Sequence, residues 1–339
     1  MLNKIIISLK AIKYNARLIK KQLKGGAKLC AVVKADAYGH GASKVSSALY
    51  NIADCFAVCT VEEGKALRLS GIDKEILVLT PVNSKDAILG IEHGLTLTAT
   101  KKSDLVMLSK TLKLLKKPSV KVHVKIDTGM NRYGEYSLTK LEEMLKYSHK
   151  NKSVEITGLY SHYAMPENKK LTRRATDKFL LAINLVKRYN RNITCHISAS
   201  GGYLLGLHFD MVRIGLMLYG YKPFEYGAMR LKKAMLVKAP VVCEKTLNVG
   251  ESALYGKKRA KKKTSLTLTR FGYADGLMRK EIKGQFNNRC MDLTAYIKTG
   301  NQKECVVMKD AQQTAKEYGT IAYEVLTSFS RRAERIYIE

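Results

Sequence analysis

Short apolar runs rich in β-branched residues recur along the first two thirds of the chain, with longer segments between them. In those segments, such as SKVSSALYNI and RATDKFLLAINLVKRY, apolar residues stand three or four positions apart, which is typical of amphipathic helices. The eight runs that we predict to be strands are KLCAVVK (28–34), CFAVCTV (55–61), EILVLTP (75–81), LTLTAT (95–100), VKVHVKID (120–127), VEITGLYSHY (154–163), ITCHISA (193–199) and DMVRIGL (210–216).

Eight strand-then-helix units in about 200 residues predict a closed (β/α)8 barrel of the TIM type, a fold that typically needs about 250 residues or somewhat fewer. An open doubly wound α/β sheet is the competing fold. That fold binds phosphate through a GxGxxG turn, which the sequence lacks. We therefore favour the barrel.

The pattern changes after about residue 228. Strand-like runs follow one another with no long helix between them, apart from a short helix predicted near QQTAKEYG (312–319). This predicts an α/β chain with two domains, a barrel over residues 8–227 and a mostly β domain over residues 228–339. The run KIIISL precedes the first barrel helix, so we expect residues 1–7 to give the β domain an additional strand.

Composition is that of an ordinary globular protein, with 46% apolar residues. No apolar stretch approaches the roughly 20 residues that span a bilayer, and the five-residue apolar patch near the start is too short for a secretory signal. We expect a cytoplasmic protein with no membrane partner. The seven cysteines are scattered without metal-ligand spacing, which predicts reduced thiols and no metal site.

The net charge is unusual, since 60 basic residues against 29 acidic ones give +31. Such a surplus attracts nucleic acid or anionic surfaces. However, the lysines are spread along the whole chain, and only GKKRAKKK (256–263) forms a dense run. No aromatic or Gly-rich RNA-binding signature accompanies the run, so we favour a solvated basic loop over a nucleic-acid site.

Polar residues gather where the predicted barrel strands end. In such barrels the loops at the carboxyl ends of the strands converge on one mouth, where the reactive groups lie. The residues at these ends are Lys34 and Tyr38, Lys125, Asp127 and Arg132, His162, Ser200 with Gly201 and Gly202, and Arg213 with Gly215.

Taken singly, each of these residues has an ordinary structural explanation, and their shared position is what favours a site. An amine desolvated in such a mouth has a lowered pKa and can form a Schiff base with a carbonyl. Small residues near Ser200 allow a backbone to approach a phosphate, and Arg213 adds a cation. This combination of amine, phosphate cradle and cation is what pyridoxal phosphate requires.

At these residues the chain resembles the alanine racemase family, fold-type III pyridoxal-phosphate enzymes with a barrel and a β domain. The matching stretches, in family order from residue 31 to residue 326, are AVVKADAYGHG, VKIDTGMNRYG, ITGLYSHYA, SASG, MVRIGLMLYG, FGYADGL, CMD and GTIAYEVL. The resemblance implies an isomerase that interconverts L- and D-alanine, with serine as an alternative substrate, and supplies D-alanine for the cell wall.

The resemblance also implies the roles of particular residues. Lys34 would carry pyridoxal 5′-phosphate as a Schiff base, with Arg213 facing the pyridine nitrogen and His162 behind it. Phosphate would be held by Tyr38, Ser200 and the backbone of Gly215 and Leu216. Arg132 would bind the substrate, and Lys125, which is carbamylated in many members, would order Arg132. The resemblance also implies a head-to-tail homodimer with shared active sites, to which Met291 and Asp292 of the partner subunit would contribute.

The main departure from the family pattern concerns the second catalytic base. A racemase needs an acid/base on each face of its carbanion, and in this family the second is a tyrosine placed four residues after the tyrosine of a YG pair. An ungapped alignment puts Tyr255 on the YG tyrosine and Arg259 on the catalytic one. Arginine, with a pKa above about 12, is a poor base. Tyr255 or a water is the candidate substitute.

Three interpretations follow from the sequence. The first is an amino-acid racemase that uses Lys34 with Tyr255 or a water, and His162 nearby. The second is a pyridoxal-phosphate-binding relative with weak or lost activity. The third, which we favour least, is a basic protein that binds nucleic acid or an anionic surface through residues 256–263.

Overall fold

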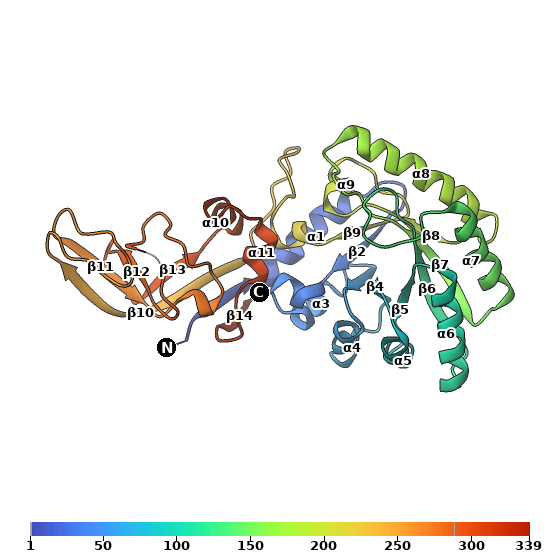
Figure 1. The fold of residues 1–339 in the computed structure, drawn as a ribbon, viewed down its shortest axis with the longest axis horizontal. Helices are drawn as coiled ribbons and strands as arrows, with labels where there is room; N and C mark the ends of the chain where they lie inside the picture. Colours follow the sequence, from blue (N-terminus) through green and yellow to red (C-terminus); the bar gives the residue numbers. More distant parts are fainter. Residues whose placement is uncertain (1, 288) are drawn as a thin grey trace. The chain divides into compact units, whose positions relative to one another are not determined.

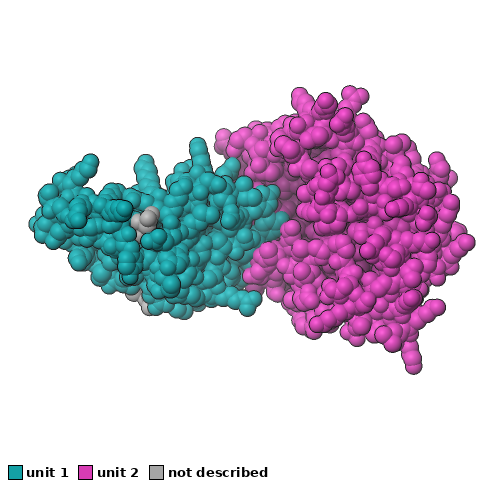
Figure 2. All heavy atoms as spheres, in the orientation of Figure 1, with its two compact units in different colours: residues 1–11, 38–41, 232–339 teal, residues 12–37, 42–231 magenta. Residues whose placement is uncertain are grey.

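The computed structural model describes residues 2–287 and 289–339. Met1 and Asn288, which fall within the predicted β domain, lie outside the described residues. The chain divides into two compact units, coloured separately in Figure 2. The barrel unit comprises residues 12–37 and 42–231, and the β unit comprises residues 1–11, 38–41 and 232–339.

Parallel strands form the centre of the barrel unit. The eight-stranded sheet has the order β8-β7-β6-β5-β4-β3-β2-β9, and each of the eight strands predicted from the sequence is present. The strands are β2 (Lys28–Val32), β3 (Cys55–Val58), β4 (Ile76–Pro81), β5 (Thr96–Ala99), β6 (Val120–Lys125), β7 (Val154–Tyr160), β8 (Thr194–His196) and β9 (Met211–Ile214).

Backbone hydrogen bonds also join the two ends of this sheet. The Asp210 N–H donates to the Cys195 carbonyl over 3.1 Å, and the Arg213 N–H donates to the Ser198 carbonyl over 3.0 Å. They close the ring between β8 and β9, so the predicted barrel is confirmed.

Helices surround the ring of strands on its outer side (Figure 1). The amphipathic pattern explains this, because in α8 the side chains that are buried recur three or four positions apart, among them Phe179, Ala182 and Val186. The helices are α1 (Leu9–Lys21), α3 (Ala42–Leu49), α4 (Val61–Leu69), α5 (Ser84–Glu92), α6 (Lys102–Leu115), α7 (Leu138–Lys150), α8 (Lys169–Lys187), α9 (Ser200–Leu204) and the 3-10 helix η1 (Leu216–Tyr219).

The turn that follows β2 winds in the opposite sense from a normal helix. Over α2 (Lys34–Tyr38), the φ angles of residues 35–38 are 51°, 52°, 53° and 54°. A helical hydrogen bond runs from the Ala37 N–H to the Val33 carbonyl over 2.8 Å. Left-handed geometry costs roughly 1–2 kcal/mol for each residue that has a Cβ. Such strain is found mainly at functional sites.

The β unit is built on a six-stranded sheet of order β12-β11-β10-β1-β14, with β13 also pairing with β10. β1 runs antiparallel to β10 and parallel to β14, so the start of the chain supplies a strand to this sheet. The elements are β1 (Lys4–Ser8), β10 (Met235–Leu247), β11 (Thr264–Thr269), β12 (Thr294–Ile297), β13 (Glu304–Met308), β14 (Glu334–Ile338), α10 (Ala311–Tyr318), α11 (Ala322–Thr327) and the 3-10 helix η2 (Tyr273–Asp275).

Most of this unit agrees with the sequence prediction of a mostly β domain. The predicted short helix is α10, whereas α11 was not predicted. A separate apolar cluster lies where β10, β11 and β12 meet, and its buried members are Leu247, Ala260, Leu266, Phe286 and Ala295. None of the helices in the described chain has both the length and the apolar character needed to cross a membrane.

Candidate active site

Eight of the predicted site residues belong to the barrel unit, and all of them follow or end a barrel strand. Because the strands are parallel, their carboxyl ends meet at one mouth of the ring. These residues are Lys34 after β2, Lys125 at the end of β6, Arg132 in the next loop, His162 after β7, Ser200 after β8, Arg213 in β9, and Gly215 and Leu216 just after it.

Arg213 is the most extensively bonded of these residues. One guanidinium nitrogen, Nη1, contacts Nδ1 of His196 over 2.5 Å and donates to the His196 carbonyl. The other, Nη2, donates to the carbonyls of Ser161 (2.7 Å) and Ile197 (3.1 Å) and contacts Nδ1 of His162 over 3.3 Å. Burial lowers the pKa of Arg213, but a guanidinium stays protonated in proteins. Its orientation is therefore fixed from several sides.

His162 lies among positive charges. Burial first, and then the charges of Arg213, Arg132, Lys125 and Lys34 in that order, lower the pKa of its imidazole to about 3. The ring is therefore neutral near pH 7 and cannot serve there as a protonated acid. The charges of all four basic residues therefore act on this ring, and Arg213 also contacts it directly.

Lys125 is held by its neighbours in the loop after β6. Its Nζ donates to the Tyr133 carbonyl over 2.8 Å and lies over the rings of Tyr133 and Tyr160. Burial, followed by repulsion from Arg132 and Arg213, lowers the pKa of this amine to about 8. Neutral amine is thus accessible close to physiological pH, which a carbamate requires.

Asp127 shapes the loop that carries Arg132. Its buried carboxylate accepts hydrogen bonds from the four consecutive N–H groups of residues 129–132. Burial alone would raise the pKa of this carboxyl, but these N–H groups and Lys125 hold it below its usual range. The Arg132 guanidinium then lies 5.0 Å from the centre of the Tyr133 ring.

Two short helices begin side by side after the last two strands. Because the Arg213 N–H bonds to the Ser198 carbonyl, the turns that follow are neighbours, with α9 starting at Ser200 and η1 at Leu216. The first N–H groups of a helix lack partners within it and attract anions. Gly202 allows α9 to pack closely, because a Cβ at this position would come within 2.5 Å of the Ser198 hydroxyl.

Lys34 begins the left-handed turn and is half-buried. Within the described residues its Nζ has no hydrogen-bond or ion-pair partner. The turn is held from α4, where the Glu63 carboxylate accepts from the Ala35 N–H over 2.7 Å and from the Cys59 N–H over 2.7 Å. The amine is therefore presented at the mouth on a backbone that is tied down.

The other four predicted site residues belong to the β unit. Tyr38 is buried, with its ring 5.9 Å from that of Tyr323. Tyr255 is 81% exposed, and Met291 is also exposed. Asp292 accepts a hydrogen bond from Arg332 over 2.7 Å. Their roles toward the barrel mouth stay predictions.

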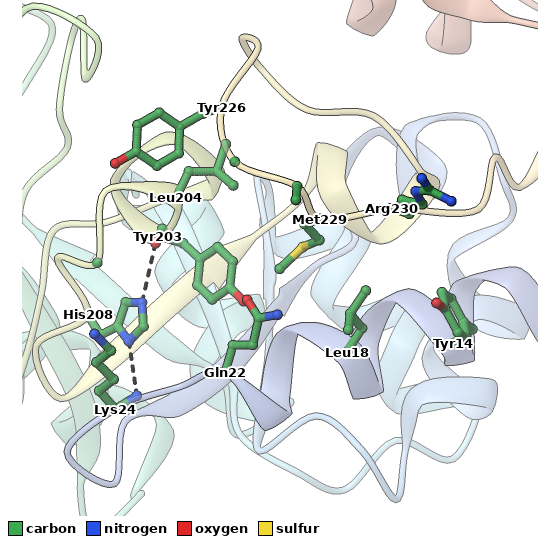
Figure 3. A pocket seen from close by; sticks show the side chains of 13 residues that line it. Tyr14, Leu18, Gln22, Lys24, Tyr203, Leu204, His208, Tyr226, Met229 and Arg230 are labelled. Atoms are coloured by element: carbon green, nitrogen blue, oxygen red, sulfur yellow. Dashed lines mark hydrogen bonds between the residues drawn. The ribbon is translucent and has the colours of Figure 1, made fainter.

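The structure has two notable cavities, and the larger is lined by none of these predicted site residues. It has a volume of about 560 Å³ and is lined by α1 and the residues just after it, by residues 203, 204, 206 and 208, and by residues 226–230 (Figure 3). Its imidazole, His208, is already paired on both nitrogens, with the Lys24 N–H and the Tyr203 carbonyl. The second cavity, of about 450 Å³, is lined by His162 and Thr128 and therefore adjoins the predicted site.

The residues that hold Arg213 from the barrel interior, above all His196 and His123, were not among those predicted from the sequence. Each lies in a strand of alternating pattern, TCHIS and VKVHVK, where a histidine looks like any inward-facing position. Proximity to a buried arginine was the only signal that could have identified them, and it exists only in three dimensions. Among the described residues, no three His, Cys, Asp or Glu side chains gather as metal ligands would.

Together, the closed barrel, the half-buried lysine at its mouth and the basic residues whose charges act on His162 define a barrel protein built to hold an anionic group next to an amine. The comparisons with known proteins give the family. The family models described as "Alanine racemase, N-terminal domain" and "Alanine racemase, C-terminal domain" match residues 7–223 and 234–337. The chain belongs to the alanine racemase family.

Individual relatives agree over nearly the whole length. Alanine racemases of Aquifex aeolicus and Staphylococcus epidermidis are each 32% identical to the chain; the first alignment covers 98% of both proteins, and the second covers 93% of this chain and 90% of the relative. A solved alanine racemase of Clostridium difficile superposes with a TM-score of 0.92 at 29% identity, covering 100% of this chain and 96% of that one. A solved alanine racemase of Bacillus anthracis with bound L-Ala-P superposes with a TM-score of 0.90 at 26% identity, covering 99% of this chain and 95% of that one.

Proposed function

We propose that the chain is a pyridoxal-phosphate-dependent racemase that interconverts L- and D-alanine and so supplies D-alanine for the cell wall. One observation carries the proposal: the charges of four basic residues act on a neutral His162 at the mouth, where the Lys34 amine has no partner among the described residues. A site with this charge suits a ligand with a phosphate and a substrate with a carboxylate.

The donor set fits pyridoxal phosphate. Lys34 would hold the cofactor covalently, and Tyr38, Ser200 and the backbone N–H groups of Gly215 and Leu216 would hold its phosphate. The two adjacent helix starts support this, since N–H groups there bind phosphate readily. When bound, the cofactor supplies an electron sink that stabilises negative charge on the α-carbon of the substrate.

Arg213 would face the pyridine nitrogen and temper that electron sink. A guanidinium donates a hydrogen bond and keeps its proton, so the ring nitrogen that accepts the bond stays unprotonated. Less delocalised charge favours return of the proton to the α-carbon, which is what racemisation requires. His162, being neutral, would act by holding Arg213 rather than by donating a proton.

Proton transfer needs one group on each face of the α-carbon. The Lys34 amine would remove or return the proton on one face. Tyr255 or a water would do so on the other face. Arg259 holds a proton too tightly to act as that base.

The substrate carboxylate would be bound by Arg132, ordered by Lys125 in its carbamylated form. The low pKa of Lys125 supports this, because only a neutral amine reacts with carbon dioxide. We further propose a cytoplasmic homodimer in which Met291 and Asp292 of one subunit complete the mouth of the other. The exposure of both side chains supports a contact surface there.

A second candidate function is that of a cofactor-binding relative with weak or lost activity. The ungapped alignment that puts Arg259 at the position of the family's catalytic tyrosine favours it. A nucleic-acid role is the weakest candidate, although residues 257–259 and 261–263 are all exposed and basic.

Racemisation should be measured in both directions on protein purified with pyridoxal phosphate, together with cofactor absorbance and entry of solvent deuterium at the α-carbon. We expect equal exchange from L- and D-alanine, and loss of the cofactor band and of activity in Lys34→Ala. Lys28→Ala, at the opposite end of the same strand, is the matched control and should change neither. Exchange from one enantiomer alone would favour the second candidate, and a wild-type protein without a cofactor band would refute both.

A further inference from the structure

A line of polar side chains, all buried except the last, runs from Arg213 through the barrel interior to Glu75. The Arg213 Nη1 lies 2.5 Å from Nδ1 of His196, and Nε2 of His196 lies 3.0 Å from Nδ1 of His123. Nε2 of His123 in turn lies 3.5 Å from the Glu75 carboxylate. Glu75 immediately precedes β4, so this line, here called the histidine chain, ends at the face of the barrel opposite the mouth.

The hydrogen-bonding capacity of arginine fixes the direction of every bond in the histidine chain. A guanidinium has donors but no acceptor, so Nδ1 of His196 must be unprotonated. In the neutral ring the proton then lies on Nε2 and is donated to Nδ1 of His123. The same argument puts the His123 proton on Nε2, facing the negative charge of Glu75. All the dipoles are thus aligned from cation to anion.

Packing holds both rings in this arrangement. The Tyr160 ring stacks on His196 with an interplanar angle of 4°. Gly158 leaves the space that His123 occupies, because a Cβ there would overlap the imidazole. At the far end, the Thr96 hydroxyl donates to the Glu75 carboxylate over 3.0 Å.

Both histidines are neutral in this environment. Burial, outweighing the nearby Glu75, lowers the pKa of His123 to about 4, and burial followed by Arg213 lowers the pKa of His196 well below its usual value. The histidine chain is therefore not a route for protons, since the guanidinium at its end does not release one. Its chemistry is orientation.

We propose that His196, His123 and Glu75 are positioning residues that lock His196 with its proton on Nε2 and thereby direct the Arg213 guanidinium into the mouth. The locked tautomer leaves Nδ1 of His196 as an acceptor for Arg213 at all times. Were the ring to change tautomer, an N–H would face the guanidinium and the bond would be lost. The consequence for catalysis rests on the proposed function, whereas the tautomers themselves do not.

The direct test is nitrogen-15 NMR of histidine-labelled holoenzyme, which distinguishes protonated from bare ring nitrogens. We expect both His196 and His123 to carry the proton on Nε2. A proton on Nδ1 of either ring would overturn the proposal, whatever the activity of the protein. Because this reading needs no turnover, failure of the racemase proposal would be seen separately, in the racemisation assay.

Two substitutions at position 123 separate orientation from packing. In His123→Asn the side-chain oxygen still accepts from Nε2 of His196, and we expect the tautomer and kcat to change little. In His123→Leu that acceptor is gone, so we expect mixed tautomers of His196 and a fall in kcat of roughly 10- to 100-fold with KM nearly constant. Equal losses in Asn and Leu, with His196 unchanged in both, would contradict the proposal.

Glu75→Gln tests the other end and avoids the core, so it stays informative if His123→Leu does not fold. The amide can present either oxygen or nitrogen to His123, so we expect a second His123 tautomer and a kcat lower by a few fold. The matched control is Glu142→Gln, which likewise removes a half-exposed carboxylate, in this case one that accepts from the Tyr189 hydroxyl. It should alter neither the His123 tautomer nor kcat. An unchanged His123 signal in Glu75→Gln would show that Glu75 does not belong to the histidine chain.

Discussion

The barrel mouth and the loop of residues 250–263 in the β unit differ sharply in how their side chains are held. At the mouth, Arg213 bonds to five groups, and Asp127 gathers four backbone N–H groups. In the loop, Tyr255 is 81% exposed, and among the described residues the Arg259 guanidinium makes one hydrogen bond, to the Gly250 carbonyl over 2.8 Å. The side chains at the mouth are held by contacts within the barrel unit, whereas those of Tyr255 and Arg259 are largely exposed to solvent.

The backbone of that loop is nevertheless well fixed. The Asn287 side chain donates to the Ala253 carbonyl over 2.8 Å and accepts from the Lys258 N–H over 3.0 Å. Gly256 is needed beside it, because a Cβ there would overlap Asn287. The comparison therefore teaches that an ordered backbone frame carries the exposed side chain of Arg259, the position where we predict that the second base is replaced.

Restoring a tyrosine should produce the largest change. We expect Arg259→Tyr to raise the racemisation rate by roughly 100- to 10,000-fold, because it returns a group that can exchange a proton on the second face. The rate should be compared with that of Lys262→Tyr, which adds a phenol to the same basic run. An equal rise in both variants, or none in Arg259→Tyr, would show that position 259 is not where the second base belongs.

Loosening the loop frame should have a smaller effect. Asn287→Ala removes hydrogen bonds to two loop carbonyls and one N–H, which we expect to favour local opening by about 1–3 kcal/mol. Trypsin should then cut within residues 257–263 roughly tenfold faster or more. Asn151→Ala, which removes an amide bonded to the Tyr147 carbonyl in α7, is the control. Cleavage at the wild-type rate in Asn287→Ala would mean that the loop is held by other contacts.

The mildest predicted effect concerns pH at the mouth. With a pKa of about 8, the Lys125 amine is neutral in roughly a tenth of molecules at pH 7 and in roughly nine tenths at pH 9. Carbamate forms on the neutral amine, so bicarbonate should raise kcat by a few fold, and more at pH 8.5 than at pH 7. Lys125→Arg should not respond. A response that is the same in Lys125→Arg would place the bicarbonate effect elsewhere.

The parts of the fold that repeat a local pattern could be predicted from the sequence. Apolar runs located all eight barrel strands, and KIIISL indicated the strand shared with the β unit. The left-handed turn after Lys34 has no such signal, because alanine favours an ordinary helix. The α11 segment, AYEVLT, is too short and too apolar to reveal a helical period.

The site shows the same division. Residues at strand ends could be found because strand direction alone gathers them at one mouth. His196, His123 and Glu75 could not, because they come from three strands that are not adjacent in the sheet and their relation depends on which side chains point inward at the same depth. The donor and acceptor roles of their polar atoms can be assigned only once the distances between these side chains are known.

The left-handed turn at residues 35–38 has a consequence for which sequences this chain can tolerate. Mirror-image winding brings each Cβ close to the following carbonyl oxygen, and branching at Cβ would worsen that collision. Valine, isoleucine and threonine are thus disfavoured at positions 35 and 37 by local stereochemistry alone. Evolution at these two alanines is restricted by the handedness of the polypeptide itself, before any substrate or cofactor imposes its own selection.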